Sequence, residues 1–275
     1  MTVGERLYPM RRPIAAASAG AAVATLGGLI GLGGAEFRLP LLIAIFAVFP
    51  HRAIRTNLLI SLATLAMAAV VRLTVLGSTN VAGYRVEILG MLTGGVIAAW
   101  IGAGVLARIP KARIMPVIAI LLLVTAALLA SETLLHDAAW SALAHDSALR
   151  LPAAILAGLL VGAISSLLGV AGGEFIIPIL IFIFGAGIKT AGTASVLISI
   201  PMVLTGTVRH WVTGHYRSIT MLQNLILPMV LGSFVGALIG GYLARWAPTD
   251  ALRIVLAVIL AMSSIKLWKM GRISN

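Results

Sequence analysis

The sequence predicts an all-α integral membrane protein built from two inverted repeats, and three observations carry this prediction. Of the 275 residues, 60% are hydrophobic and only 10% are charged, whereas soluble domains are roughly a quarter charged. Several apolar runs approach about 20 residues, the length that a helix needs to cross a bilayer. The stretch Gly31-Leu-Gly-Gly-Ala-Glu-Phe-Arg-Leu-Pro40 recurs 138 residues later as Gly169-Val-Ala-Gly-Gly-Glu-Phe-Ile-Ile-Pro178.

Each half of the chain contains five apolar segments, which we interpret as helical elements. The elements predicted for the first half are 13–34, 37–50, 54–76, 85–107 and 113–135. Those predicted for the second half are 150–172, 175–187, 190–211, 217–244 and 249–269. The first repeat is then 1–135, the second is 150–275, and residues 136–149 form an external linker.

Matching residues outside the glycine-rich motif also indicate an internal duplication. The segment Leu58-Leu-Ile-Ser61 matches Val196-Leu-Ile-Ser199 at the same spacing. The other matches are Val71-Arg72 with Val208-Arg209, and Gly94, Gly102 and Pro110 with Gly232, Gly240 and Pro248.

The second element of each half is too short to span a membrane. Residues 37–50 would form a helix of about 20 Å, whereas the bilayer core is about 30 Å thick. Elements one and two could form a re-entrant hairpin, two short tilted helices, or one kinked span. If the chain turns back at the glycines, the repeats are inverted, and most Lys and Arg residues then lie on the side of the N-terminus. The positive-inside rule favours this arrangement, in which the protein lies in a bacterial inner membrane and both termini are on the cytoplasmic side.

Composition and motifs also bear on partners and cofactors. The net charge is +12, but Lys and Arg fall mostly between apolar runs, so we expect a lipid bilayer and no nucleic acid as partner. The absence of Cys excludes disulfides and thiolate metal sites. The histidines lie mostly in loops, His210 and His215 have no nearby carboxylate that would suggest a zinc site, and there is no P-loop. We therefore expect no cofactor, no metal and no enzymatic activity.

The two motifs, each a glycine-rich stretch followed by an apolar segment with proline, resemble the sulfite exporter TauE/SafE family over essentially the whole chain. The resemblance implies a small membrane carrier, commonly an exporter, of sulfite or organosulfonates such as sulfoacetate, and it is consistent with a homodimer. The family motif falls on Gly31, Gly33, Gly34 and Pro40, and again on Gly169, Gly172, Gly173 and Pro178. The chain departs from the family pattern at Ala35, Ala171, Glu36 and Glu174.

Interrupted helices provide a physical basis for binding an anion. Where a helix restarts after a break, its first backbone N–H groups are unpaired and carry partial positive charge. Two such ends facing each other near the membrane centre would form an anion site. The glycines that would line it are Gly31, Gly33, Gly34, Gly172 and Gly173. The alternative is that these glycines only permit close helix packing, with Pro40 and Pro178 as structural parts of the motif.

Glu36 and Glu174 occupy the same position in the two motifs, and three roles are open. A protonatable carboxylate beside the site would couple proton flow to anion transport. Each Glu could instead cap its half-helix by accepting hydrogen bonds from the free N–H groups. The third alternative is a cationic substrate that the two carboxylates bind together.

Other polar residues could also line the cavity. Arg38 could bind an anion with its planar guanidinium, neutralise Glu36, or extend to the membrane surface. Arg72 and Arg209 could close opposite gates, or anchor the protein at the membrane interface. The remaining candidates are Asn57 and Ser61 in the first half and their repeat equivalents Ser195 and Ser199. Hydrogen bonds between helices are the alternative role for these four.

These observations predict a secondary carrier of small sulfur-containing anions that works by alternating access. The paired motifs would hold the substrate near the bilayer centre while one set of helices rocks against the other. The alternatives are an anion channel, a carrier of a cation, and a membrane subunit that transports nothing.

Overall fold

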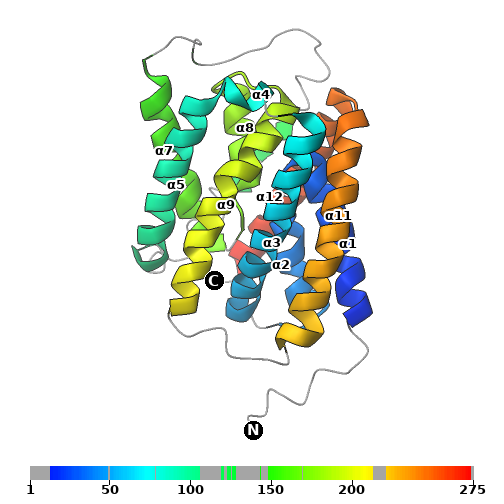
Figure 1. Ribbon diagram of the computed structural model, residues 1–275. Helices are drawn as coiled ribbons and strands as arrows, with labels where there is room; N and C mark the ends of the chain where they lie inside the picture. Colours follow the sequence, from blue (N-terminus) through cyan, green and yellow to red (C-terminus); the bar gives the residue numbers. More distant parts are fainter. Residues whose placement is uncertain are drawn as a thin grey trace.

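The computed structural model describes a helical bundle (Figure 1). The residues that it describes are 13–48, 50–77, 79–105, 119–120, 123–124, 126–127, 143, 148–168, 170–212 and 221–273. Every regular element within this part of the chain is a helix, which confirms the predicted all-α class.

The helices follow the predicted order. The helices of the first half are α1 (Pro13–Ile30), α2 (Ala35–Ala44), α3 (Pro50–Leu76), α4 (Thr79–Ala82) and α5 (Arg85–Val105). Those of the second half are α7 (Arg150–Leu168), α8 (Gly173–Phe182), α9 (Ile188–Val212), the π-helical turn η3 (Leu222–Ile226), α11 (Leu227–Trp246) and α12 (Thr249–Ile273). The element predicted at 113–135 lies largely outside the described residues, and the short helix α4 was not expected.

The second element of the first half is displaced from its predicted position. It was expected at 37–50, but α2 ends at Ala44 and α3 already begins at Pro50. Two local features explain the shift. Ala47 has a φ of 52°, which no helix continues through, and proline at the first position of a helix loses no hydrogen bond.

Two pairs of helices form the edges of the bundle, and both pairs join one half of the chain to the other (Figure 1). In the α1–α11 pair, a Cβ atom on Gly232 would lie 1.9 Å from the carbonyl oxygen of Ala17. In the α5–α7 pair, a Cβ atom on Gly94 would lie 2.1 Å from the carbonyl oxygen of Ile155. Gly232 lies 138 residues after Gly94, and Ile155 lies 138 residues after Ala17, so the two contacts are repeat equivalents. Glycine is therefore needed at both interfaces, because only its missing side chain allows the backbones to come so close.

Helices α3 and α9 lie between these pairs and run in opposite directions. Arg72, near the end of α3, contacts Thr193 in the first turns of α9. Leu58, near the start of α3, lies beside Gly206 towards the end of α9. Since α3 and α9 are repeat equivalents, this antiparallel packing is the geometry that inverted repeats require. The inversion of the halves in the membrane and the limits of the two repeats stay predictions.

The surface of the bundle is suited to lipid. The described residues include four helices that are long and apolar enough to cross a membrane: Pro13–Ile30, Arg52–Leu76, Ile188–Arg209 and Leu222–Trp246. Large apolar side chains also point outwards, among them Leu89, Leu156 and Trp246, each at least 60% exposed. Such a surface is stable only in a bilayer, so this is a multi-pass membrane protein.

Candidate functional site

The chain turns back at both glycine-rich motifs. Gly34 and Gly172 directly precede α2 and α8, with φ angles of 74° and 79° in the left-handed region. Glycine adopts this conformation without steric cost. Gly34 also lies against Val23 and Gly27 of α1, so α2 folds back along α1. This fold-back excludes one kinked span through both elements of the first half, and the re-entrant position of the hairpin in the membrane stays a prediction.

The two turns meet near the middle of the bundle. We call the interruption between α1 and α2 the first break and that between α7 and α8 the second break. A Cβ atom on Gly173 would lie 3.1 Å from the Cα atom of Leu32, so the two breaks touch each other. Gly33 packs against Leu65, and Gly172 lies near Met202. Leu65 and Met202 lie close to the middle of α3 and α9, and the contact is therefore near half the depth of the bundle. The N-termini of α2 and α8, with their partial positive charge, begin at this point.

Arg38 donates hydrogen bonds to oxygens from both halves of the chain. Its side chain is completely buried, which excludes the alternative that it extends to the membrane surface. One amino group donates to the hydroxyl of Ser61 at 3.0 Å. The other donates to Thr64 at 3.1 Å and, at 3.5 Å, to Ser233 and to the carbonyl of Gly33. This arrangement joins α2, α3 and α11 around a guanidinium group that lies next to the first break.

The repeat-equivalent polar residues of α3 and α9 differ in their contacts. Asn57 donates from its amide nitrogen to the carbonyl of Ala35 at 3.0 Å, in the first turn of α2. Its equivalent, Ser195, faces the corresponding turn of α8, because a Cβ atom on Gly173 would lie 3.1 Å from its hydroxyl oxygen. The hydroxyls of Ser195 and Ser199 are buried, and neither has a hydrogen-bond partner among the described residues. Both hydroxyls are therefore available to a ligand, and that of Ser195 lies at the start of α8.

Glu174 lies in the first turn of α8 and is 3% exposed. The side chain of its equivalent, Glu36, lies outside the described part of the structure, and so does that of Pro40. Pro178 lies inside α8. Because proline has no N–H group, the carbonyl of Glu174 lacks its usual helical donor. Within the described residues, no group of three or more His, Cys, Asp or Glu side chains could hold a metal ion.

Arg72 is completely buried, an environment that does not fit an anchor at the membrane interface. One amino group donates to the carbonyls of Gly28 at 2.7 Å and Leu29 at 3.1 Å, in the last turn of α1. The rest of the guanidinium donates to Thr193 at 3.2 Å and to the carbonyl of Lys189 at 3.1 Å. The carbonyls that end a helix have no partner within it, so Arg72 caps α1 where the first break begins. It also fixes this end of α1 to the start of α9.

Arg209, the other gate candidate, lies in α9 and is half-buried. It lies far from both glycine-rich stretches in the sequence, and its side chain is less buried than that of Arg72. Its role as a gate stays a prediction.

Gly31 lies directly against α9, since a Cβ atom there would be 2.2 Å from the carbonyl oxygen of Gly192.

Several residues around the breaks were not expected from the sequence. Ser233 contacts Arg38 from α11, and Ser165 donates to the carbonyl of Val170 within the second break. Glu87 and Arg150 form a buried ion pair between α5 and α7. One signal was available for this pair: an acidic residue in a membrane segment is costly and almost always has a partner.

Comparison with known proteins agrees with this architecture. The model of the family described as "Sulfite exporter TauE/SafE" matches residues 15–267. The chain is also similar to the "Probable membrane transporter protein y4hK" of Sinorhizobium fredii strain NBRC 101917 / NGR234. The two are 28% identical over 180 residues, which cover 63% of this chain and 67% of the relative. No solved structure matches the chain. Because the family match spans nearly the whole chain, including both glycine-rich motifs, this protein belongs to the sulfite exporter TauE/SafE family of membrane transporters.

Proposed function

We propose that this protein is a secondary carrier that exports a small sulfur oxyanion, either sulfite or an organosulfonate, across the bacterial inner membrane. The family name supports a sulfur oxyanion and outward transport, and the name of the relative supports transport in general. The distribution of Lys and Arg supports cytoplasmic termini.

The observation that carries the proposal is the contact between the two breaks at Leu32 and Gly173. It brings the N-termini of α2 and α8 together near mid-depth, where their unpaired N–H groups favour negative charge. The buried hydroxyl of Ser195 faces the same place. A sulfite or sulfonate group has three oxygens, each able to accept hydrogen bonds, and so matches a site made mainly of donors.

The surrounding charge also favours an anion over a cation. Arg38 and Arg72 are both completely buried, and both contact the backbone at the first break. The hydrogen bonds described above join them to hydroxyl and carbonyl oxygens. In a medium of low dielectric constant, two such cations strongly raise the electrostatic potential around the two breaks. Of the two motif glutamates, the structure describes the side chain of Glu174, and its carboxylate offsets part of this positive charge.

In the proposed mechanism the substrate binds between the breaks, and access alternates between the two faces of the membrane. The tightly packed α1–α11 and α5–α7 pairs would act as scaffolds. The re-entrant helices α2 and α8, of 10 residues each, would move against them. A channel would conduct without this alternation, so counterflow of labelled substrate in proteoliposomes distinguishes a carrier from a channel.

The serine hydroxyls provide the direct test of the site. We expect Ser195→Ala and Ser199→Ala each to weaken sulfite binding about tenfold, because each removes one hydrogen bond to a charged group. Stability should stay within about 0.5 kcal/mol of the unmodified protein, since neither hydroxyl has a partner within the described structure to lose. The measurements are the stabilisation of the purified protein by sulfite, by an alkyl sulfonate and by acetate, together with the unfolding temperature without ligand.

Ser166→Ala is the matched control, because this hydroxyl donates only to the carbonyl of Ala163 in its own helix at 2.9 Å. It should leave sulfite binding unchanged. Equal binding by the control and both test variants would mean that the start of α8 is not the substrate site.

Proton coupling through the motif carboxylates is a separate part of the proposal. We expect Glu174→Gln to remove the pH dependence of transport while substrate binding persists, because glutamine keeps the shape but cannot release a proton. Transport should be measured in proteoliposomes at two external pH values with an alkyl sulfonate, whose charge is constant near neutral pH. If both Glu174→Gln and Glu36→Gln keep the pH profile of the unmodified protein, neither carboxylate carries the proton.

A further inference from the structure

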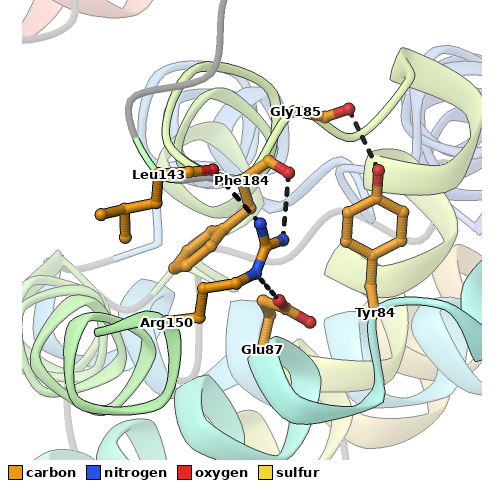
Figure 2. A network of polar contacts seen from close by, with 6 residues as sticks. All are labelled: Tyr84, Glu87, Leu143, Arg150, Phe184 and Gly185. Atoms are coloured by element: carbon orange, nitrogen blue, oxygen red, sulfur yellow. Dashed lines mark hydrogen bonds and ion pairs between the residues drawn. The ribbon is translucent and has the colours of Figure 1, made fainter. Parts of the chain in front are cut away.

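The C-terminal end of α8 is fixed by an unusual set of polar contacts (Figure 2). Three consecutive carbonyls at this end each accept a hydrogen bond from a different segment of the chain. The donors are the backbone N–H of Leu143 to Ile183 at 3.1 Å, the guanidinium of Arg150 to Phe184 at 3.1 Å, and the hydroxyl of Tyr84 to Gly185 at 3.0 Å. The end of α8 is thus attached to the linker between the halves, to α7 and to the turn before α5.

Arg150 is the centre of this arrangement. It is 5% exposed and forms an ion pair with Glu87, which is 3% exposed. Its guanidinium lies 5.3 Å from the centre of the Phe184 ring and also donates to the carbonyl of Leu143 at 3.3 Å. A cation at the end of a helix is stabilised by the negative end of the helix dipole, and the Glu87 carboxylate orients the guanidinium towards α8. Figure 2 shows Arg150 between Glu87 and the two carbonyls.

The partners of α8 in these contacts belong to a scaffold. Arg150 is the first residue of α7, and Glu87 lies in the first turn of α5. These helices pack so closely that a Cβ atom on Gly158 would lie 2.2 Å from the carbonyl oxygen of Met91. Such a pair moves as one unit. Helix α8 has only 10 residues, about 15 Å in length. A displacement of its C-terminal end therefore displaces Gly173 and Glu174 at its other end.

Apolar residues occupy two of the positions that correspond, across the repeat, to the polar residues around the end of α8. The positions equivalent to Tyr84 and Glu87 are Leu222 and Leu225, and the position equivalent to Phe184 is Phe46. Leu225 and Phe46 lie instead in a buried apolar cluster. An apolar cluster thus lies at the end of α2, in the place that corresponds to that of Glu87 at the end of α8.

We propose that Tyr84, Glu87 and Arg150 form a clamp that positions α8, and that its release opens the face of the protein where α5 and α7 begin. Glu87 and Arg150 act as positioning residues, because they reach the site only through α8. The clamp rests on the contacts at the end of α8, and its test uses no substrate. Its failure is therefore distinguishable from failure of the proposed transport function.

The experiment measures access to a single cysteine beside the clamp. The chain contains no cysteine, so Ala186→Cys introduces one thiol just after α8, at a position that is 3% exposed. A membrane-impermeant maleimide is added to the protein in liposomes, with and without Glu87→Gln or Tyr84→Phe. Ala53→Cys reports on the opposite, apolar closure, because Ala53 is fully buried in the apolar cluster that contains Phe46.

We expect Glu87→Gln to increase the labelling rate of Cys at position 186 at least about tenfold, since it removes the buried carboxylate that pairs with the guanidinium of Arg150. Tyr84→Phe removes a single hydrogen bond and should increase the rate about threefold. Labelling at position 53 should not increase in either variant. If both reporters become reactive together, or if neither does, the clamp does not gate this face.

A charge swap separates the clamp from a merely stabilising ion pair. Glu87→Arg combined with Arg150→Glu keeps two opposite charges together, but glutamate at 150 cannot donate to the carbonyl of Phe184. Under the proposal the swapped protein labels at position 186 as fast as the Glu87→Gln variant. Recovery of the slow labelling of the unmodified protein would overturn it.

Discussion

Replacing Gly192 by alanine is expected to destabilise this protein by about 2 kcal/mol, although alanine is the better helix former. Gly192 lies within α9, where helix propensity alone favours alanine by about 1 kcal/mol. A Cβ atom there would, however, lie 2.0 Å from the carbonyl oxygen of Ile30 and 2.6 Å from an amino group of Arg72. Backbone atoms at the end of α1 cannot move away without disturbing the first break. The cost of overpacking, about 1–3 kcal/mol and sometimes more, therefore outweighs the gain in propensity.

Gly206→Ala is the matched control in the same helix. The nearest atom to a Cβ at this position is a methyl carbon of Leu58 at 3.7 Å, an ordinary contact. This variant should be neutral or more stable by up to about 1 kcal/mol. Thermal unfolding of both variants in the same lipid or detergent gives the comparison. Equal stability of the two would show that α9 does not pass so close to the first break.

The helical elements could be predicted because their signal is local. Apolar runs near the length of a membrane span indicate where α1, α3, α9 and α11 lie, and the duplicated motif indicates where the chain turns. The boundary between α2 and α3 depends on the left-handed conformation of Ala47. Alanine rarely adopts this conformation, so the residue types at this point gave no signal that α2 ends here.

The candidate site could be predicted only in part, for a similar reason. The glycines that break the helices are visible in the sequence, and so is their pairing across the repeat. The contacts of the arginines are not, because they depend on how distant helices pack. Arg72 reaches Lys189 and Thr193, more than 100 residues away. Arg150 is the first residue of a predicted element and follows the predicted external linker directly, yet it pairs with Glu87 in the other half.

The second large effect is expected for Arg72→Met. Methionine fills a similar volume but donates no hydrogen bond, so the variant loses the contacts to Gly28, Leu29 and Lys189 and to the hydroxyl of Thr193. Hydrogen bonds to a charged group contribute about 1.5–3 kcal/mol each after desolvation is included. Relaxation of the surrounding chain recovers some of this loss. We expect a destabilisation of about 4 kcal/mol, measured by thermal unfolding, and loss of anion transport in proteoliposomes.

Two further variants identify the cause of this effect. Arg52→Met removes an arginine from the exposed start of the same helix and should change stability by less than about 0.5 kcal/mol. Arg72→Lys keeps the charge, but a single ammonium group cannot reach carbonyls on both α1 and α9. Its stability should lie between that of Arg72→Met and that of the unmodified protein. If lysine restored full stability, the positive charge alone would be sufficient. A stable Arg72→Met variant would instead mean that the end of α1 needs no cap, and that the first break is held by glycine packing alone.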